Sequence, residues 1–215
     1  MRVAMIGATG LVGSLAAPKL LAQGWTVDAL VRRPSGIEHS RWREHVAPPE
    51  QWPAIASSLE AEAAISALGT TMRQARSQAA FRAVDHDMVV GFARAAARAG
   101  TRRMVTVSSV GADPSSANFY LRTKGEMESA LDALGFERLD ILRPGLLRGE
   151  RGGERRLGER IAIAVSPIAN LVLRGPLDRF AAIDAEVVAA ALAGALERTE
   201  PGTWRHENRG IRQLA

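Results

Sequence analysis

The residues best suited to chemistry are a tyrosine and a lysine four positions apart, Tyr120 and Lys124. On a helix this spacing puts both side chains on one face, where the ammonium of Lys124 can stabilise the phenolate form of Tyr120. Such a tyrosine can exchange a proton with a substrate carbonyl while a nicotinamide transfers hydride. Tyr120 is the only tyrosine in the chain and Lys124 one of two lysines. The alternative is a packed tyrosine beside a surface lysine.

Two serines, Ser108 and Ser109, end the apolar run that precedes the Tyr120 segment. A hydroxyl at this position can hydrogen-bond a substrate oxygen beside Tyr120. Serine also ends strands without any catalytic role. We choose Ser109 over Ser108 as the site serine.

A glycine pattern, Gly7, Gly10 and Gly13, lies between an apolar run and a helical pattern at the start of the chain. Glycines here let the backbone turn tightly and approach a pyrophosphate, whose charge is met by amide N–H groups at the helix start. The alternative is a turn with a purely structural role. The residues expected to contact the nucleotide are Gly7, Thr9, Gly10, Leu11 and Val12.

Two arginines, Arg32 and Arg33, follow the second expected strand, where an acidic residue would hold the hydroxyls of an adenosine ribose. The guanidinium fork matches a phosphate in both charge and geometry. The expected cofactor is therefore the 2′-phosphorylated NADP(H), with Arg32 preferred over Arg33 as its contact. The alternative is a pair of arginines that only ends a strand at the surface.

Strand patterns alternate with helix patterns along most of the chain. Strands are expected at residues 3–6, 26–31, 64–68, 104–107 and 139–142, with a short one near Val46. Helices are expected before Gly24 and over residues 77–99, 118–135 and 185–196, followed by a polar tail. This alternation predicts an α/β fold, a doubly wound parallel sheet of the Rossmann type with a small C-terminal substrate-side extension. Ligands then bind at the carboxyl ends of the strands.

Composition limits the other possibilities. The 215 residues are 47% hydrophobic and 24% charged, which predicts one globular domain. The strand-helix alternation occupies about residues 1–150 of this domain, and residues 151–215, where the alternation breaks, are expected to be a reduced substrate-side segment. The chain has no cysteine, so disulfides, thiolate metal sites and cysteine nucleophiles are excluded; no metal site is expected. The net charge is +5, but the basic residues are scattered along the chain, so no nucleic-acid partner is expected.

No apolar run reaches the roughly 20 residues of a membrane span, and there is no room for a signal peptide before the first strand. We therefore expect no membrane span and a cytoplasmic location. The longest apolar run, residues 161–173, could be covered by a second copy of the chain in a homodimer.

These motifs together resemble the short-chain dehydrogenase/reductase superfamily. The turn at residues 7–13 is similar to its extended or atypical branch, and residues 108–114, 118–126 and 142–147 are similar to the Tat-interacting-protein-like oxidoreductases. The resemblance covers about residues 1–150. It implies a Rossmann sheet, NADP(H) and a Ser-Tyr-Lys set at Ser109, Tyr120 and Lys124. It further implies that Leu68, Gly69 and Thr70 line the nicotinamide ribose and that Pro144 and Leu146 flank the nicotinamide.

The expected function is NADP(H)-dependent reduction of a small carbonyl-type substrate, with Tyr120 as general acid and Lys124 also binding the cofactor ribose. A rival from another class is an NADP(H)-binding regulatory or scaffold protein with little or no turnover, in which cofactor occupancy orders the arginine-rich residues 148–160 for a partner. A nucleotide-sugar epimerase or dehydratase shares the fold, but Arg32 argues against unphosphorylated NAD.

Overall fold

The computed structural model describes residues 1–149 and 175–215. It contains a seven-stranded sheet in the order β3-β2-β1-β4-β5-β6-β9, in which every neighbouring pair is parallel. The strands are β1 (Arg2–Ile6), β2 (Thr26–Val31), β3 (Trp42–Val46), β4 (Ala63–Ser66), β5 (Arg103–Val107), β6 (Arg138–Leu142) and β9 (Gly202–His206). The expected doubly wound Rossmann fold is confirmed.

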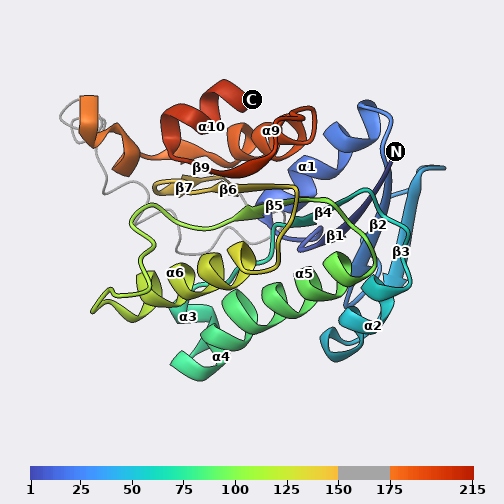
Figure 1. Ribbon diagram of the computed structural model, residues 1–215, viewed down its shortest axis with the longest axis horizontal. Helices are drawn as coiled ribbons and strands as arrows, with labels where there is room; N and C mark the ends of the chain where they lie inside the picture. Colours follow the sequence, from blue (N-terminus) through green and yellow to red (C-terminus); the bar gives the residue numbers. More distant parts are fainter. Residues whose placement is uncertain (150–174) are drawn as a thin grey trace.

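Helices cover both faces of the sheet (Figure 1). One face carries α1 (Leu11–Ala22), α9 (Ala185–Ala195) and α10 (Asn208–Leu214). The other carries α2 (Trp52–Ser57), α5 (Val89–Arg98) and α6 (Phe119–Asp132), together with α3 (Met72–Ala75) and α4 (Gln78–Arg82). A π-helical turn, η2 (Ala83–Met88), joins α4 to α5. The described residues also contain the 3-10 turns η1 (Pro49–Gln51) and η3 (Gly175–Phe180) and a small two-stranded sheet of β7 (Leu147–Arg148) and β8 (Ile183–Asp184).

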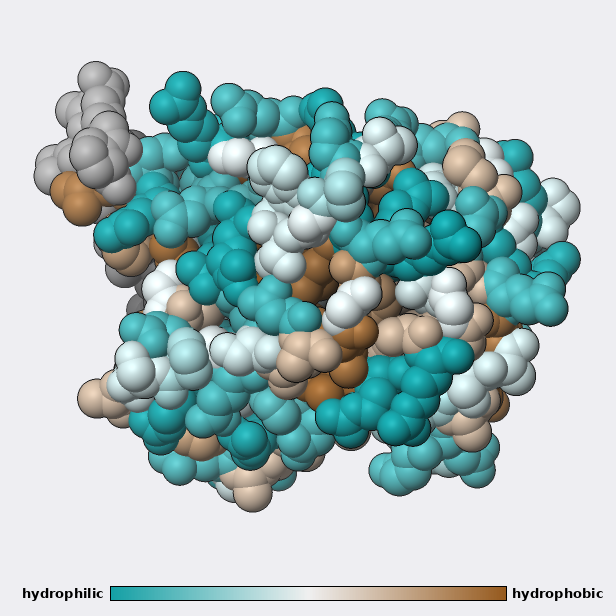
Figure 2. Space-filling model, in the orientation of Figure 1, coloured by the Kyte–Doolittle hydropathy of each residue, from teal (hydrophilic) through white to brown (hydrophobic). Residues whose placement is uncertain are grey.

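The hydrophobic core lies in two layers, one on each face of the sheet. Alternate residues of a strand enter opposite layers: Val3 and Met5 pack with α1 and α9, whereas Ala4 and Ile6 pack with α2, α5 and α6. All four side chains are essentially inaccessible to solvent, as strands covered on both faces require. Figure 2 shows one face of the molecule, on which hydrophobic residues gather mainly between the two helical layers and hydrophilic residues cover those layers.

The C-terminal residues differ from the expected polar tail. They form β9, which pairs with β6, and α10, whose Ile211 is fully buried in the α1 and α9 layer. The pattern was missed because β9 is an edge strand with mostly exposed polar residues, so it lacks the apolar run of a central strand. The expectations for residues 150–160 and 161–173 lie outside the described residues.

Within the described residues, no helix is both long and apolar enough to cross a membrane.

Candidate functional site

The glycine turn after β1 is built for close backbone approach. Gly7 has a φ of +81°, and a Cβ there would lie 2.4 Å from the backbone carbon of Ala67, just after β4. A Cβ on Gly13 would lie 2.1 Å from the carbonyl oxygen of Gly7, so α1 also packs directly on the turn. Side chains at these two positions would push the turn, the helix and the loop after β4 apart.

The start of α1 suits an anion. Gly10 caps the helix without a side-chain hydrogen bond, and the first turn contains no acidic residue. The first N–H groups of a helix lack intrahelical partners and carry the positive end of the helix dipole. This cradle of glycine backbone and free helix start fits the pyrophosphate of a dinucleotide. The residues predicted to contact the nucleotide, Gly7, Thr9, Gly10, Leu11 and Val12, lie in this turn and at the start of α1, and their contacts stay a prediction.

Tyr120 and Lys124 lie one turn apart on α6, as their spacing predicts. Asn118 caps this helix, its side-chain oxygen accepting from the backbone N–H of Tyr120 at 2.9 Å. The half-buried ring of Tyr120 packs against Phe81 of α4, with the ring centroids 5.3 Å apart. These contacts position the tyrosine from both its own helix and the neighbouring one.

Lys124 forms a buried ion pair with Asp85 of the π-helical turn η2. The Nζ–Oδ1 distance is 2.7 Å, and the two side chains are 4% and 1% exposed. The second carboxylate oxygen of Asp85 accepts from the backbone N–H of Thr70 at 2.8 Å. One carboxylate therefore joins the Tyr120 helix to the loop after β4.

Sequence reasoning did not identify Asp85, although a signal was present. Asp85 is four residues after Phe81 and four before Val89, on the apolar face of the helical pattern. A carboxylate on such a face requires a buried partner. The π-helical turn is itself unusual, since such turns are rare and frequent at functional sites.

These contacts link the predicted segments at the carboxyl edge of the sheet. Gly7 meets the backbone after β4, Thr70 binds Asp85, and Asp85 binds Lys124. The loops after β5 and β6 are linked as well, because the N–H of Val110 donates to the carbonyl of Pro144 at 3.0 Å. Arg32 and Arg33 are exposed just beyond the end of β2, which is a strand of the same sheet.

The two serines have different environments. The hydroxyl of buried Ser108 donates to Glu128 of α6 at 2.5 Å. Ser109 is half-buried and donates only a 3.3 Å contact to the carbonyl of Val110. Because the Ser108 hydroxyl is committed to a carboxylate, Ser109 remains our choice, and its role stays a prediction.

Glu128 is the centre of a polar cluster beneath the loop after β6. Its carboxylate also accepts from Arg143, with the Nε–Oε1 distance 3.0 Å, and from Arg205 of β9, with the Nε–Oε2 distance 3.3 Å. The hydrogen bond to Glu128 raises the pKa of Arg143, against the opposite effect of burial. This fixed charge cluster anchors the residue that immediately precedes the predicted nicotinamide loop.

Asn208, from the expected polar tail, also binds that loop. It is fully buried; its side-chain oxygen accepts from the N–H of Gly145 at 3.0 Å, and its amide nitrogen donates to the carbonyls of Asp178 and Ala181 at 2.8 Å. The predicted contacts Pro144 and Leu146 flank Gly145, the first buried and the second exposed. Asn208 was missed because its partners come from turns that no pattern in the sequence pairs with it.

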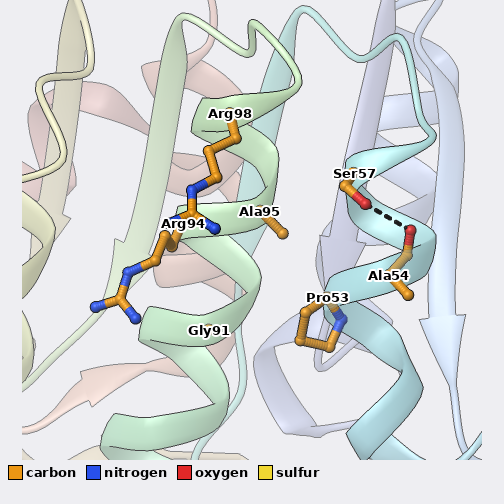
Figure 3. A pocket seen from close by; sticks show the side chains of 7 residues that line it. All are labelled: Pro53, Ala54, Ser57, Gly91, Arg94, Ala95 and Arg98. Carbon is orange, nitrogen blue, oxygen red and sulfur yellow. Dashed lines mark hydrogen bonds between the residues drawn. The ribbon is translucent and has the colours of Figure 1, made fainter.

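A hollow of about 340 Å³ lies away from these residues, between α2 and α5 (Figure 3). Arg94 and Arg98 project along its α5 side, and Pro53, Ala54 and Ser57 line its α2 side. It shares no residue with the predicted site. In residues 1–149 and 175–215, no group of three or more His, Asp and Glu side chains could hold a metal ion.

Comparisons with known proteins agree with this geometry. A family model described as NAD(P)H-binding matches residues 7–164. "Protein FMP52, mitochondrial" of Coccidioides immitis is 39% identical over 217 residues, covering 92% of this chain and 88% of that protein. The protein of the same name from Aspergillus fumigatus is 41% identical over 202 residues, covering 90% and 86%.

Solved structures share the fold. The Bordetella bronchiseptica enzyme WbmH in complex with NAD+ has a TM-score of 0.71 at 15% identity, covering 96% of this chain and 75% of that one. A short-chain dehydrogenase/reductase superfamily protein from Agrobacterium tumefaciens with bound NAD has a TM-score of 0.68 at 19% identity, covering 96% and 77%. The expected NAD(P)-binding Rossmann-type domain is confirmed, and this chain shares its fold with these proteins.

The expected cytoplasmic location is wrong, because the similar proteins are named as mitochondrial. The lack of a long apolar run does not distinguish these compartments, so it could not support the cytoplasm. The chain belongs to the NAD(P)H-binding family that includes the fungal FMP52 proteins, in agreement with its Rossmann sheet, its glycine turn and its extended match to the family model.

Proposed function

We propose that this protein is an NADP(H)-dependent oxidoreductase of the short-chain dehydrogenase/reductase type that reduces a small carbonyl substrate. The observation that carries the proposal is the chain of contacts from Gly7 through the loop after β4 to Asp85 and Lys124. These contacts bring the glycine turn and the Tyr120–Lys124 face of α6 to one edge of the sheet. The proposal takes a small molecule as substrate and assigns no role to nucleic acid or to a membrane span.

The cofactor contacts follow from the same arrangement. The turn at residues 7–12 would hold the pyrophosphate, and Arg32 with Arg33 would meet the 2′-phosphate. Lys124 would bind the nicotinamide ribose. The loop residues Leu68, Gly69 and Thr70 would line that ribose, and Pro144 and Leu146 would flank the nicotinamide, which supplies the hydride.

Three side chains would handle the substrate. The hydroxyl of Ser109 orients the carbonyl oxygen by a hydrogen bond. The phenol of Tyr120 donates its proton to that oxygen as negative charge develops there. The ammonium of Lys124 stabilises the resulting phenolate, and the carboxylate of Asp85 keeps that ammonium in place.

A Tyr120→Phe variant tests the proposal. It removes the phenolic proton but keeps the ring that packs on Phe81, so the fold and the cofactor site are retained. We expect NADPH binding to stay within about twofold of wild type while turnover of responsive aldehydes, ketones or quinones falls by about 10²-fold or more. Turnover equal to wild type would show that Tyr120 is not the acid.

A second candidate is an NADP(H)-binding regulatory or scaffold protein without turnover. The observation that favours it is the buried ion pair of Lys124 with Asp85, whose carboxylate also accepts from the Thr70 backbone, because a purely structural cluster would display the same contacts. A wild-type protein that binds NADPH yet turns over none of those carbonyl classes, and whose partner capture depends on NADPH, would support this candidate instead.

A further inference from the structure

A half-buried carboxylate on β3 organises the turn that follows β2. Glu44 accepts from the backbone N–H of Ser35 at 3.1 and 3.2 Å, one bond to each carboxylate oxygen. It also accepts from the hydroxyl of Ser35 and, at 2.8 Å, from the indole N–H of Trp42. No part of the proposed chemistry uses this carboxylate.

The turn is fixed at both ends. At its start, the carbonyl of Val31 accepts from the N–H of Ala47, which follows β3, at 3.0 Å. At its end, Ser35 is bound by Glu44, and the Ser35 hydroxyl oxygen accepts from the N–H of Ile37 at 3.1 Å. Only residues 32–34 lie between the two anchors, and they carry the exposed Arg32 and Arg33.

The charge of Glu44 is maintained by these contacts. Burial alone would raise the pKa of this carboxyl, but the hydrogen bonds from Ser35 and Trp42 outweigh burial and hold the pKa below its usual value. Glu44 is therefore an ionised acceptor at neutral pH, and hydrogen bonds to an ionised group are stronger than those between neutral groups.

We infer that Glu44 is a specificity-positioning residue, which holds the turn at residues 32–35 so that Arg32 and Arg33 are presented to the 2′-phosphate of NADP(H). The inference rests on the proposed preference for NADP(H). A turn already fixed before binding loses less conformational freedom when the phosphate arrives, and so binds it more tightly. NADH has no 2′-phosphate, so its affinity depends little on this turn.

The sign of the effect separates positioning from simple electrostatics. If Glu44 acted only as a negative charge near a bound phosphate, its neutralisation would strengthen NADPH binding. If it acts by holding the turn, its neutralisation weakens NADPH binding despite the lost repulsion. Glu38 is an exposed carboxylate in the same segment, and Glu38→Gln changes the net charge by the same amount.

The experiment is calorimetric titration of the purified full chain with NADPH and, separately, NADH, at one fixed salt concentration. For Glu44→Gln we expect the Kd for NADPH to rise about tenfold and the Kd for NADH to change by less than about twofold. Glu38→Gln should leave both within about twofold of wild type. Ser35→Ala, which changes no charge, should weaken NADPH binding by about two- to threefold with NADH unaffected.

The outcomes distinguish this inference from the proposed function. If Glu44→Gln binds NADPH as tightly as Glu38→Gln does, or more tightly, the positioning role is overturned. The proposed cofactor is nevertheless kept if wild type prefers NADPH and this preference collapses in Arg32→Ala. Equal wild-type affinity for NADPH and NADH, unchanged in Arg32→Ala, overturns both. Should Glu44→Gln fail to fold, as judged by circular dichroism, the Ser35→Ala result decides, and equal loss of both cofactors would refute the inference.

Discussion

Replacing Asp85 with alanine would leave the Lys124 ammonium buried without its partner. The ion pair joins atoms 2.7 Å apart, and neither side chain is more than 4% exposed. Breaking a buried pair by removing one partner costs about 3–5 kcal/mol, because the remaining charge stays desolvated. The N–H of Thr70 also loses its 2.8 Å acceptor, but this contribution is not additive with the first. We therefore expect Asp85→Ala to reduce the free energy of unfolding by about 3–5 kcal/mol.

The assay is urea denaturation of the cofactor-free protein, with unfolding monitored by tryptophan fluorescence. Asp87→Ala is the matched control, since Asp87 is two residues away, 59% exposed, and within the described residues pairs with the adjacent His86. Such a surface pair contributes about 0–1 kcal/mol. For a chain of this size the Asp85→Ala loss corresponds to a Tm lower by about 10 °C.

A double variant tests whether the unpaired ammonium of Lys124 causes the loss of stability. In Asp85→Ala with Lys124→Met, the uncompensated charge is gone, so we expect recovery of a large part of the lost stability. If Asp85→Ala loses less than about 1 kcal/mol, as Asp87→Ala should, the ammonium is not held in a dry ion pair and the reasoning about this site is refuted.

Three further predictions concern the supporting structure. Gly7→Ala would place a Cβ 2.4 Å from backbone, and we expect it to weaken NADPH binding in calorimetry by more than about tenfold. Asn208→Ala leaves the N–H of Gly145 without its acceptor, and should lower the free energy of unfolding in urea by about 1–3 kcal/mol. Burial raises the pKa of Asp28, but hydrogen bonds from Arg2 and His45 prevail and lower the pKa below its usual value. The ionised carboxylate of Asp28 therefore contributes fully to stability above about pH 3.9, the pKa in the unfolded chain, and this contribution disappears as pH falls through the lower pKa of the folded protein.

Each of these has a control or a contrary result. Gly100→Ala has a similar φ of +90°, but among the described residues no atom beyond its chain neighbours lies within 4 Å of the added Cβ, so it should leave NADPH binding unchanged. Equal losses in the two variants would argue against a crowded glycine turn. Arg209→Ala, an exposed neighbour, should stay within about 0.5 kcal/mol of wild type. For Asp28, the stability of Asp28→Asn should fall less than that of wild type between about pH 5 and pH 2, and parallel curves would contradict the assignment.

The central strands and the glycine turn were predictable because their signals are local. β2 has the bounds expected from its apolar run, and β1, β5 and β6 begin one residue earlier than expected. The Tyr120 helix begins after Asn118 as its capping chemistry requires. Strand and helix periodicity therefore placed the carboxyl edge of the sheet without knowledge of the tertiary structure.

The partners of the site residues could not be predicted in the same way. Asp85 and Asn208 act through contacts with residues 39 and 63 positions away, at Lys124 and Gly145. Nothing in the sequence specifies such pairings. The edge strand β9 was missed for a related reason, since its side chains are mostly exposed and only its ladder with β6 defines it.

The most direct test of the proposed function is titration of wild type and Arg32→Ala with NADPH and NADH at the same salt concentration. The proposed function predicts that wild type prefers NADPH by about tenfold or more, and that Arg32→Ala removes the preference while NADH binding stays the same. Equal affinity of wild type for both cofactors, or a preference that survives in Arg32→Ala, would contradict it.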